Sequence, residues 1–268
     1  MNNYDWNLIK KNDFDWNIPY GCIFDYLQVC EESSKNDEKF NNFKQNSQYK
    51  AILEHISKEE SDLFIGEMKN LNSVSEGEIS LFKENDVYGN PEIYNYALFG
   101  QISPSTIRYI KNTLDIQNYF GDDIKDIVEI GGGYGGLCKT MQVRYDFKNY
   151  VLIDLPQVNM LSKKYISKFS SLSGKVSQFS PDEITNIKNI DLVISNYAFS
   201  ECDVKIQEFY YNTVISNAKY FYMVYNNITP YNMNWEKFKT YASKDFNIHI
   251  EEEIRSTHTN YIFYGTKK

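Results

Sequence analysis

The chain has 268 residues, of which 42% are hydrophobic and 16% aromatic, a composition typical of a globular protein and not of a disordered one. Its formal net charge is -8, and no stretch carries the basic face that a nucleic-acid partner would require. No run approaches the ~20 apolar residues that span a bilayer, and the first residues, MNNYDWNLIKKNDFDW, lack the apolar core of a secretion signal. The four cysteines and three histidines show no ligand spacing, so we expect no metal site and a cytoplasmic location. Together with the charge and the lack of long apolar runs, this predicts a protein without nucleic-acid, membrane or metal contacts.

Residues 1–120 are mostly polar and are predicted to form a helical cap or lid. Helical spacing occurs over residues 40–56 and 103–114, and a turn is expected at residues 88–91, which read YGNP. The charged, Asn-rich stretch 31–48 is typical of a solvated helix or a mobile loop.

From residue 121 onward, short β-rich runs alternate with helical stretches, as in a parallel sheet with crossover helices. Strands are predicted at 126–130, 150–154, 175–179, 190–196 and 220–225, and helices at 135–145, 157–169, 204–217 and 234–243. Two further β-rich runs, 246–254 and 260–266, are too close together for a crossover helix. They predict an antiparallel hairpin at the end of the sheet of an α/β catalytic domain covering residues 121–268.

The segment IVEIGGGYGGLC, residues 127–138, reads as a strand, a tight glycine turn and the start of a helix. Such a turn presents backbone N–H groups and the positive end of a helix dipole, which suits an anionic or nucleoside ligand. Gly131, Gly133 and Gly136 satisfy the GxGxxG fingerprint of dinucleotide-binding proteins, so NAD is one candidate ligand. The acidic Glu129 before the turn and the late start of the nucleotide fold speak against NAD.

Asp154 ends the next predicted strand, 21 residues after Gly133. An acidic side chain at this place can accept hydrogen bonds from both ribose hydroxyls of an adenosine. NAD and S-adenosylmethionine both contain such a ribose, so Asp154 does not distinguish them.

Four segments, VEIGGGYGG, LIDLP, DLVISNYAFSE and THTNYIFYG, resemble class I S-adenosylmethionine-dependent methyltransferases. The resemblance is closest to the sugar O-methyltransferases of bacterial surface-polysaccharide clusters and covers about residues 85–268. It implies a Rossmann-like seven-stranded sheet with a reversed last strand, which agrees with the hairpin predicted above. It also implies that the glycine turn approaches the methionine and ribose of the cofactor, and that the end of the third strand lies beside the adenine.

The resemblance yields a set of expected cofactor contacts, with S-adenosylhomocysteine as the product. In chain order these contacts are Tyr88, Arg108, Glu129, Gly131, Gly133, Asp154, Leu155, Gln178, Phe179, Ser195 and Asn196. Arg108 is expected to meet the methionine carboxylate or an acceptor phosphate, with a structural salt bridge as the alternative. Segments 88–94 and 103–109 are expected to close over the cofactor.

Methyl transfer from a sulfonium requires the protein to position an acceptor oxygen and to exclude water, and needs no metal. A sugar hydroxyl also needs a base, worth typically ~10²–10⁴-fold in rate. Glu201, after the fourth strand, and His258, in the last hairpin, are the candidate bases, with a helix-terminal charge and a structural histidine as the alternatives. Tyr197, Asn226 and Asn227 are candidates for acceptor binding, although the tyrosine could pack in the core and asparagine also suits turns.

The sequence therefore predicts a methyltransferase acting on a sugar hydroxyl, on a nucleotide-linked sugar such as a GDP-heptose for capsule or another surface glycan. One alternative is a methyltransferase acting on a small phosphorylated or amidated precursor of a capsule modification, because fold does not fix the acceptor. A more distant one is an NAD(P)-dependent sugar oxidoreductase, and a cofactor-binding partner subunit without turnover is the non-enzymatic reading. A homodimer is the expected form of any self-association.

Overall fold

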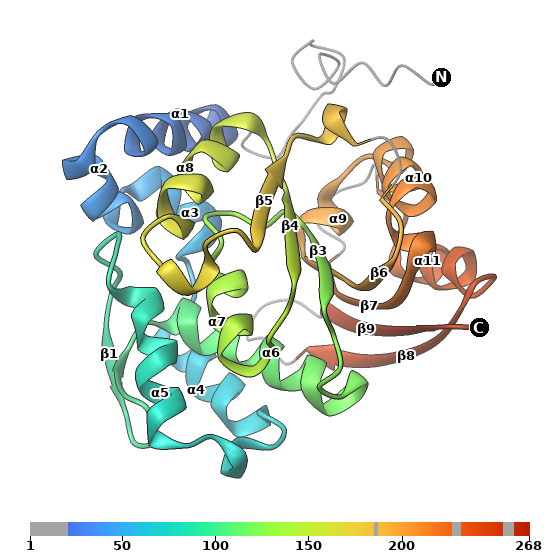
Figure 1. Cartoon of the computed structure of the whole chain (residues 1–268), viewed down its shortest axis with the longest axis horizontal. Helices are drawn as coiled ribbons and strands as arrows, with labels where there is room; N and C mark the ends of the chain where they lie inside the picture. Colours follow the sequence, from blue (N-terminus) through green and yellow to red (C-terminus); the bar gives the residue numbers. More distant parts are fainter. Residues whose placement is uncertain (1–20, 185–186, 227–231, 254–259) are drawn as a thin grey trace.

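A mostly parallel, seven-stranded sheet forms the centre of the protein in a computed structural model that describes residues 21–184, 187–226, 232–253 and 260–268 (Figure 1). The strands are β3 (Asp126–Ile130), β4 (Asn149–Ile153), β5 (Val176–Phe179), β6 (Ile190–Asn196), β7 (Ala218–Tyr225), β8 (Phe246–Glu253) and β9 (Asn260–Lys267). Their order is β5-β4-β3-β6-β7-β9-β8, and β9 runs antiparallel to both of its neighbours. All seven predicted strands are confirmed, with ends shifted by no more than two residues, and so is the reversed last strand.

Successive residues of the central strands face two separate hydrophobic cores. Ile127 and Leu192 belong to one core, whereas their neighbours Val128 and Val193 belong to the other. Because side chains alternate along a strand, a strand that is buried on both faces must be apolar at nearly every position. This requirement explains why the segments IVEI and DLVIS are apolar at nearly every position and contain only one acidic residue each.

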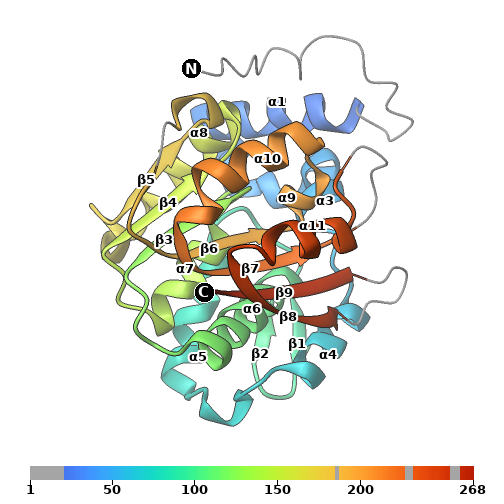
Figure 2. The same ribbon diagram turned by 90° about the vertical axis from the view of Figure 1, so that its right-hand side faces the viewer.

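Helices cover both faces of the sheet (Figures 1 and 2). One face packs against α6 (Pro104–Phe120), α7 (Gly136–Arg144) and α8 (Pro156–Ile166), and the other against α10 (Val204–Thr213) and α11 (Trp235–Ala242). The four helices predicted after residue 121 are confirmed as α7, α8, α10 and α11, and a short α9 (Ala198–Glu201) follows β6. Short 3₁₀ turns lie at Phe43–Gln45, Leu71–Ser73, Glu84–Asp86, Ser170–Leu172, Pro181–Glu183 and Ile215–Asn217.

The N-terminal part contains α1 (Gly21–Lys35), α2 (Asp37–Asn42), α3 (Ser47–Leu53), α4 (Lys58–Glu67) and α5 (Glu76–Lys83). It also contains a small antiparallel hairpin, β1 (Tyr94–Tyr96) and β2 (Gly100–Ile102), which the sequence did not suggest because its strands have only three residues each. The expectation that the stretch 31–48 is a solvated helix or a mobile loop is only partly met. Phe40, Phe43 and Lys44 within it are almost fully buried. These three side chains pack among the aromatic rings of the core on the α6–α8 side of the sheet.

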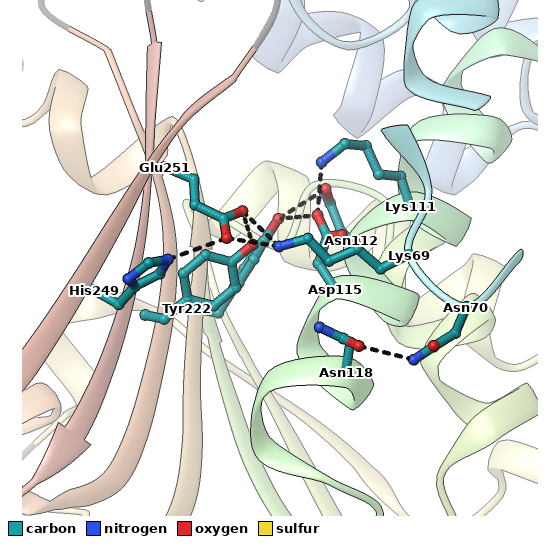
Figure 3. A network of polar contacts seen from close by, with 10 residues as sticks. Lys69, Asn70, Lys111, Asn112, Asp115, Asn118, Tyr222, His249 and Glu251 are labelled. Atoms are coloured by element: carbon teal, nitrogen blue, oxygen red, sulfur yellow. Dashed lines mark hydrogen bonds and ion pairs between the residues drawn. The ribbon is translucent and has the colours of Figure 1, made fainter. Parts of the chain in front are cut away.

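Helix α6 is the most deeply buried helix of the N-terminal part and joins it to the sheet. The Ser103 side chain caps its first turn, and Pro104 occupies the first helical position. On its inner side, Lys111 Nζ lies 2.6 Å from Asp115 Oδ2, and the Tyr222 hydroxyl of β7 donates to Asn112 Oδ1 at 3.2 Å (Figure 3). This polar network fixes the position of α6 against the sheet.

Candidate functional site

The loops after β3, β4 and β6 meet at the carboxyl ends of these strands, where the strand order reverses direction between β3 and β6. The Gly131 N–H donates to the Ile153 carbonyl at 2.8 Å. A Cβ on Gly131 would lie 2.0 Å from the Cβ of Ala198, so only glycine allows the turn after β3 to approach α9 this closely. Open α/β sheets bind their ligands at this switch point, which makes it the candidate site.

The glycine turn is shaped by left-handed backbone conformations. Gly131 has a φ of 76° and Gly133 a φ of 54°, values that favour glycine. A Cβ on Gly133 would lie 2.9 Å from the Leu53 Cδ1 at the end of α3. The turn is therefore in contact with the N-terminal helices on one side and with the sheet on the other.

Asp154 and Gly133, two of the predicted cofactor residues, are in direct contact. Asp154 Oδ2 accepts a hydrogen bond from the Gly133 N–H at 2.9 Å, and its Oδ1 accepts one from the Leu155 N–H at 2.7 Å. Burial raises the pKa of Asp154 to about 6. A carboxylate has about four acceptor positions, so this one is held in orientation and can still accept from the two hydroxyls of a ribose.

Glu129 lies at the fourth position of β3 and is buried on the side of the sheet that faces α6 to α8. The Tyr150 hydroxyl of β4 donates to Glu129 Oε2 at 2.7 Å. Burial raises the pKa of Glu129 to about 8, and the hydrogen bond from Tyr150 opposes this shift. Its contact with a cofactor remains a prediction, whereas its tyrosine partner emerges only from the fold.

Arg108 is a buried cation near the N-terminus of α6, with only 4% of its surface exposed. Its guanidinium carbon lies 5.5 Å from the ring centre of Tyr109 and 5.7 Å from that of Tyr197. Within the described parts of the chain no carboxylate lies within ion-pair distance of it, and its Nε has no hydrogen-bond partner. The alternative of a structural salt bridge is therefore not found there.

Tyr197 follows β6 in a strained conformation, with a φ of 67° and a ψ of -40°. Its hydroxyl donates to both carboxylate oxygens of Glu253 at 2.8 Å, and its N–H donates to the Val224 carbonyl at 2.8 Å. Strained residues of this kind concentrate at functional sites, where the surrounding structure must hold them. Its ring faces Arg108, so Tyr197 lies between that cation and Glu253.

Glu201 and Asn226, predicted separately as base and acceptor contact, lie next to each other. Asn226 Nδ2 donates to Glu201 Oε1 at 2.8 Å, and the Ser200 hydroxyl donates to Asn226 Oδ1 at 2.9 Å. Glu201 is exposed as a whole residue, yet loss of hydration around its carboxylate raises its pKa, and the hydrogen bond from Asn226 opposes this shift. A carboxylate with a raised pKa, held in one orientation, suits a general base.

Ser195 and Asn196 end β6. The Ser195 hydroxyl is buried, donates to the Ile130 carbonyl at 2.9 Å and accepts from the Phe199 N–H at 3.0 Å, so its observed contacts join β3 to α9. Among the described residues, Asn196 Oδ1 is a buried acceptor without a partner. The predicted contacts of both residues with a cofactor remain predictions.

Leu155, Gln178 and Phe179 lie near Asp154. Gln178 pairs with Leu152 across β4 and β5, and the Phe179 carbonyl accepts from the Asp154 N–H at 3.2 Å. The Phe179 ring is 39% exposed. An exposed aromatic ring at the end of the third strand of the sheet is available for stacking against an adenine.

Tyr88 lies in an aromatic cluster of the N-terminal part and α8. Its ring packs against the rings of Phe40, Phe169 and Tyr165, at centre distances of 5.7, 5.8 and 6.4 Å. The observed role of Tyr88 is to join α2 to α8. A cofactor contact of Tyr88 remains a prediction.

His258 and Asn227 lie outside the described residues. The residues on either side of 254–259 are Glu253 and Asn260, and Asn260 Nδ2 donates to Glu253 Oε2 at 2.8 Å. Glu253 therefore links Asn260, the first residue of β9, to Tyr197, a connection absent from the sequence prediction. The only sequence signal for it is that it is the last of three consecutive glutamates in β8, where alternation places Glu251 and Glu253 on the same face.

No group of three or more His, Cys, Asp or Glu side chains in the described ranges could hold a metal ion. No helix in those ranges is both long and apolar enough to cross a membrane.

No family model and no curated protein sequence matches the chain. Similar solved structures include the methyltransferase domain of bacterial CtHen1-CN, at 12% identity over 59% of this chain and 96% of that chain, with a TM-score of 0.47. The magnesium protoporphyrin IX methyltransferase from Synechocystis PCC 6803 with bound SAM is 10% identical over 60% of this chain and 77% of that chain, with a TM-score of 0.48. M. capricolum TrmK in complex with S-adenosyl-homocysteine is 14% identical over 60% and 68%, with a TM-score of 0.47. At these identities the likeness concerns the arrangement of helices and strands alone.

Proposed function

We propose that the protein is an S-adenosylmethionine-dependent methyltransferase. The observation that carries the proposal is the contact between the Asp154 carboxylate and the Gly133 N–H, because it joins the two elements that would hold a nucleoside. The bound cofactor would supply a methyl group on a positively charged sulfur. The chain's own residues would bind it at residues 131–136, accept its ribose hydroxyls on Asp154 and flank its adenine with Leu155 and Phe179.

The strand order supports this cofactor over NAD. Dinucleotide-binding sheets have the order 3-2-1-4-5-6. Counted with β3 as the first strand, the order here is 3-2-1-4-5-7-6, because the antiparallel β9 is inserted between β7 and β8. An inserted reversed strand is what the resemblance to class I methyltransferases implies.

We propose that the acceptor is a hydroxyl of a nucleotide-linked sugar, such as a GDP-heptose. Its methylation would take place in the cytoplasm and serve the synthesis of capsule or another surface glycan. The support is Glu201, a carboxylate whose pKa is raised by loss of hydration and whose orientation is held by the Asn226 amide. Glu201 would remove the hydroxyl proton as the oxygen attacks, and His258 is the second candidate for this role. Residues 1–120 would close over the site, and the enzyme would act alone or as a homodimer.

The first experiment is mass spectrometry of reactions that contain S-adenosylmethionine and a panel of acceptors. The panel pairs GDP-, UDP-, CDP- and dTDP-linked sugars with small phosphorylated metabolites. A product heavier by one methylene on a nucleotide sugar supports the full proposal, and one only on a phosphorylated metabolite keeps the methyltransferase and rejects the sugar. Calorimetric binding of NADH, without binding of S-adenosylhomocysteine, would reject both.

The base is tested once an acceptor is known. We expect Glu201→Gln to lower kcat by about 10²–10⁴-fold, while the affinity for S-adenosylhomocysteine stays the same. The matched control is Glu236→Gln, at an exposed position of α11, which should keep the wild-type rate. A wild-type rate in the Glu201 variant, with loss of activity in His258→Ala, would transfer the role to the histidine.

A further inference from the structure

Three buried polar atoms beside the glycine turn have no hydrogen-bond partner in the described protein: Tyr49 Oη, Glu54 Oε1 and Arg108 Nε. Their side chains expose only 0%, 9% and 4% of their surface. Tyr49 belongs to α3, Glu54 follows it directly, and Arg108 comes from α6. Buried polar atoms in native proteins nearly always have a partner, so three neighbouring exceptions from two helices indicate a ligand.

These residues flank the glycine turn on the side of the N-terminal helices. Leu53, which precedes Glu54, would lie 2.9 Å from a Cβ on Gly133. Tyr109, which follows Arg108, would lie 2.6 Å from a Cβ on Gly136. The chain neighbours of Glu54 and Arg108 thus lie against the turn at Gly133 and Gly136.

The three side chains share one electrostatic environment. The Glu54 charge raises the pKa of both Tyr49 and Tyr109, and Arg108 lowers the pKa of Tyr109 and of Glu54. Burial nevertheless raises the pKa of Glu54, and the charge of Lys44 opposes this shift most strongly. Lys44 itself donates to the Asn85 carbonyl at 3.0 Å and lies over the Tyr134 ring, and it forms no ion pair with the residues that the structure describes.

A buried carboxylate and a buried guanidinium that form no ion pair in the described chain are expensive, because each has lost its hydration. A ligand with an ammonium and a carboxylate group would satisfy both at once. Guanidinium groups bind carboxylates in a planar, two-pronged geometry, and carboxylates accept from ammonium groups. An α-amino acid carries both groups on a single carbon.

We propose that Glu54 and Arg108 bind the α-ammonium and α-carboxylate groups of the cofactor's methionine part, with the Tyr49 hydroxyl as a third contact. This inference rests on the proposed function, and it adds Glu54 and Tyr49 to the site. The N-terminal helices then contribute binding groups directly. Cofactor binding would then also stabilise the position of these helices, because the ligand supplies the partners that the buried groups lack.

The test compares S-adenosylhomocysteine with 5′-methylthioadenosine, which keeps the nucleoside and lacks the amino-acid part, by calorimetry. We expect Glu54→Gln and Arg108→Gln to weaken S-adenosylhomocysteine binding by about tenfold to a hundredfold and to leave methylthioadenosine binding unchanged. Tyr49→Phe, which keeps the ring packing, should weaken only S-adenosylhomocysteine, by about threefold to tenfold. The control Glu59→Gln, at an exposed position of α4, should change neither affinity.

Thermal melting separates a binding role from a structural one. We expect the ligand-free Glu54→Gln protein to melt at or above the wild-type temperature, because the substitution removes a buried charge that has no ion pair. Equal losses for both ligands, no loss for either, or wild-type protein that binds methylthioadenosine as tightly as S-adenosylhomocysteine would overturn the inference. Wild-type protein that binds neither ligand would instead overturn the proposed function, and the inference with it.

Discussion

The close contact between Gly131 and Ala198 gives a quantitative prediction about how the site is assembled. Gly131→Ala places a Cβ 2.0 Å from the Ala198 Cβ, at a residue whose φ is 76°. Two separate costs follow. An L-residue in the left-handed region costs roughly 1–2 kcal/mol, and forcing an extra carbon into a packed position costs about 1–3 kcal/mol.

The expected loss in the free energy of unfolding is therefore about 2–5 kcal/mol, measured by urea denaturation. Gly174→Ala is the matched control, since Gly174 has a φ of 73° and a Cβ there would meet nothing within 4 Å. It should show only the backbone cost of about 1–2 kcal/mol. The difference between the two variants measures the contact between the β3 and β6 loops.

A double-mutant cycle isolates this contact further. Ala198→Gly removes the opposing Cβ, so the Gly131→Ala, Ala198→Gly double variant should recover most of the packing cost and keep the backbone cost. Equal destabilisation by Gly131→Ala and Gly174→Ala, together with no recovery in the double variant, would refute the reasoning. The loops after β3 and β6 would then not meet as described.

Three further predictions concern the site and the network behind it. Asp154→Ala should weaken S-adenosylhomocysteine binding by at least about tenfold with the fold intact, and unchanged calorimetric affinity would reject the ribose assignment. The pKa of Glu129 is raised from 4.5 in the unfolded chain to about 8 in the folded protein. Between these two pH values the folded protein keeps a proton that the unfolded chain releases, so Glu129 makes the free energy of unfolding fall as the pH rises. Glu129→Gln should therefore gain stability over wild type between pH 5 and pH 9, by up to about 5 kcal/mol in urea unfolding, and a pH-independent difference would contradict the burial argument. Asp115→Ala leaves Lys111 buried and unpaired and should lower the free energy of unfolding by about 3–5 kcal/mol. The control Asp62→Ala breaks an exposed pair with the same 2.6 Å distance to Lys58 and should lower it by under about 1 kcal/mol. Equal losses in thermal or urea unfolding would show that burial does not set the cost.

The sheet could be predicted from the sequence because its signals are local. The runs IVEI and DLVISN must be apolar at nearly every position to be buried on both faces, and this pattern marks both strands to the residue. The glycine turn is equally local, because the left-handed conformations of Gly131 and Gly133 restrict those positions to glycine. The hairpin followed from the short spacing between two β-rich runs.

The environment of the site could not be predicted, because it depends on contacts between distant parts of the chain. Nothing near Tyr150 in the sequence marks it as the partner of Glu129, since the two meet only across paired strands. Glu253 similarly reaches Tyr197 from a strand 56 residues later. Sequence periodicity identifies elements, whereas partners of buried charges are set by sheet register and helix packing.

The N-terminal part shows the same limit for a whole segment. The composition of the stretch 31–48, rich in Asn and charge, suggests a solvated helix or a mobile loop, yet Lys44 within it, and Tyr49 and Glu54 soon after it, are buried beside the glycine turn. Polar residues are buried only where the folded chain or a ligand satisfies them. Lys44 is satisfied by the Asn85 carbonyl and the Tyr134 ring, whereas Glu54 Oε1 and Tyr49 Oη are not satisfied within the described chain. Glu54 and Tyr49, whose burial the sequence does not predict, therefore decide whether the N-terminal helices only cover the site or form part of it. Binding measurements on ligands with and without an amino-acid group distinguish these two roles.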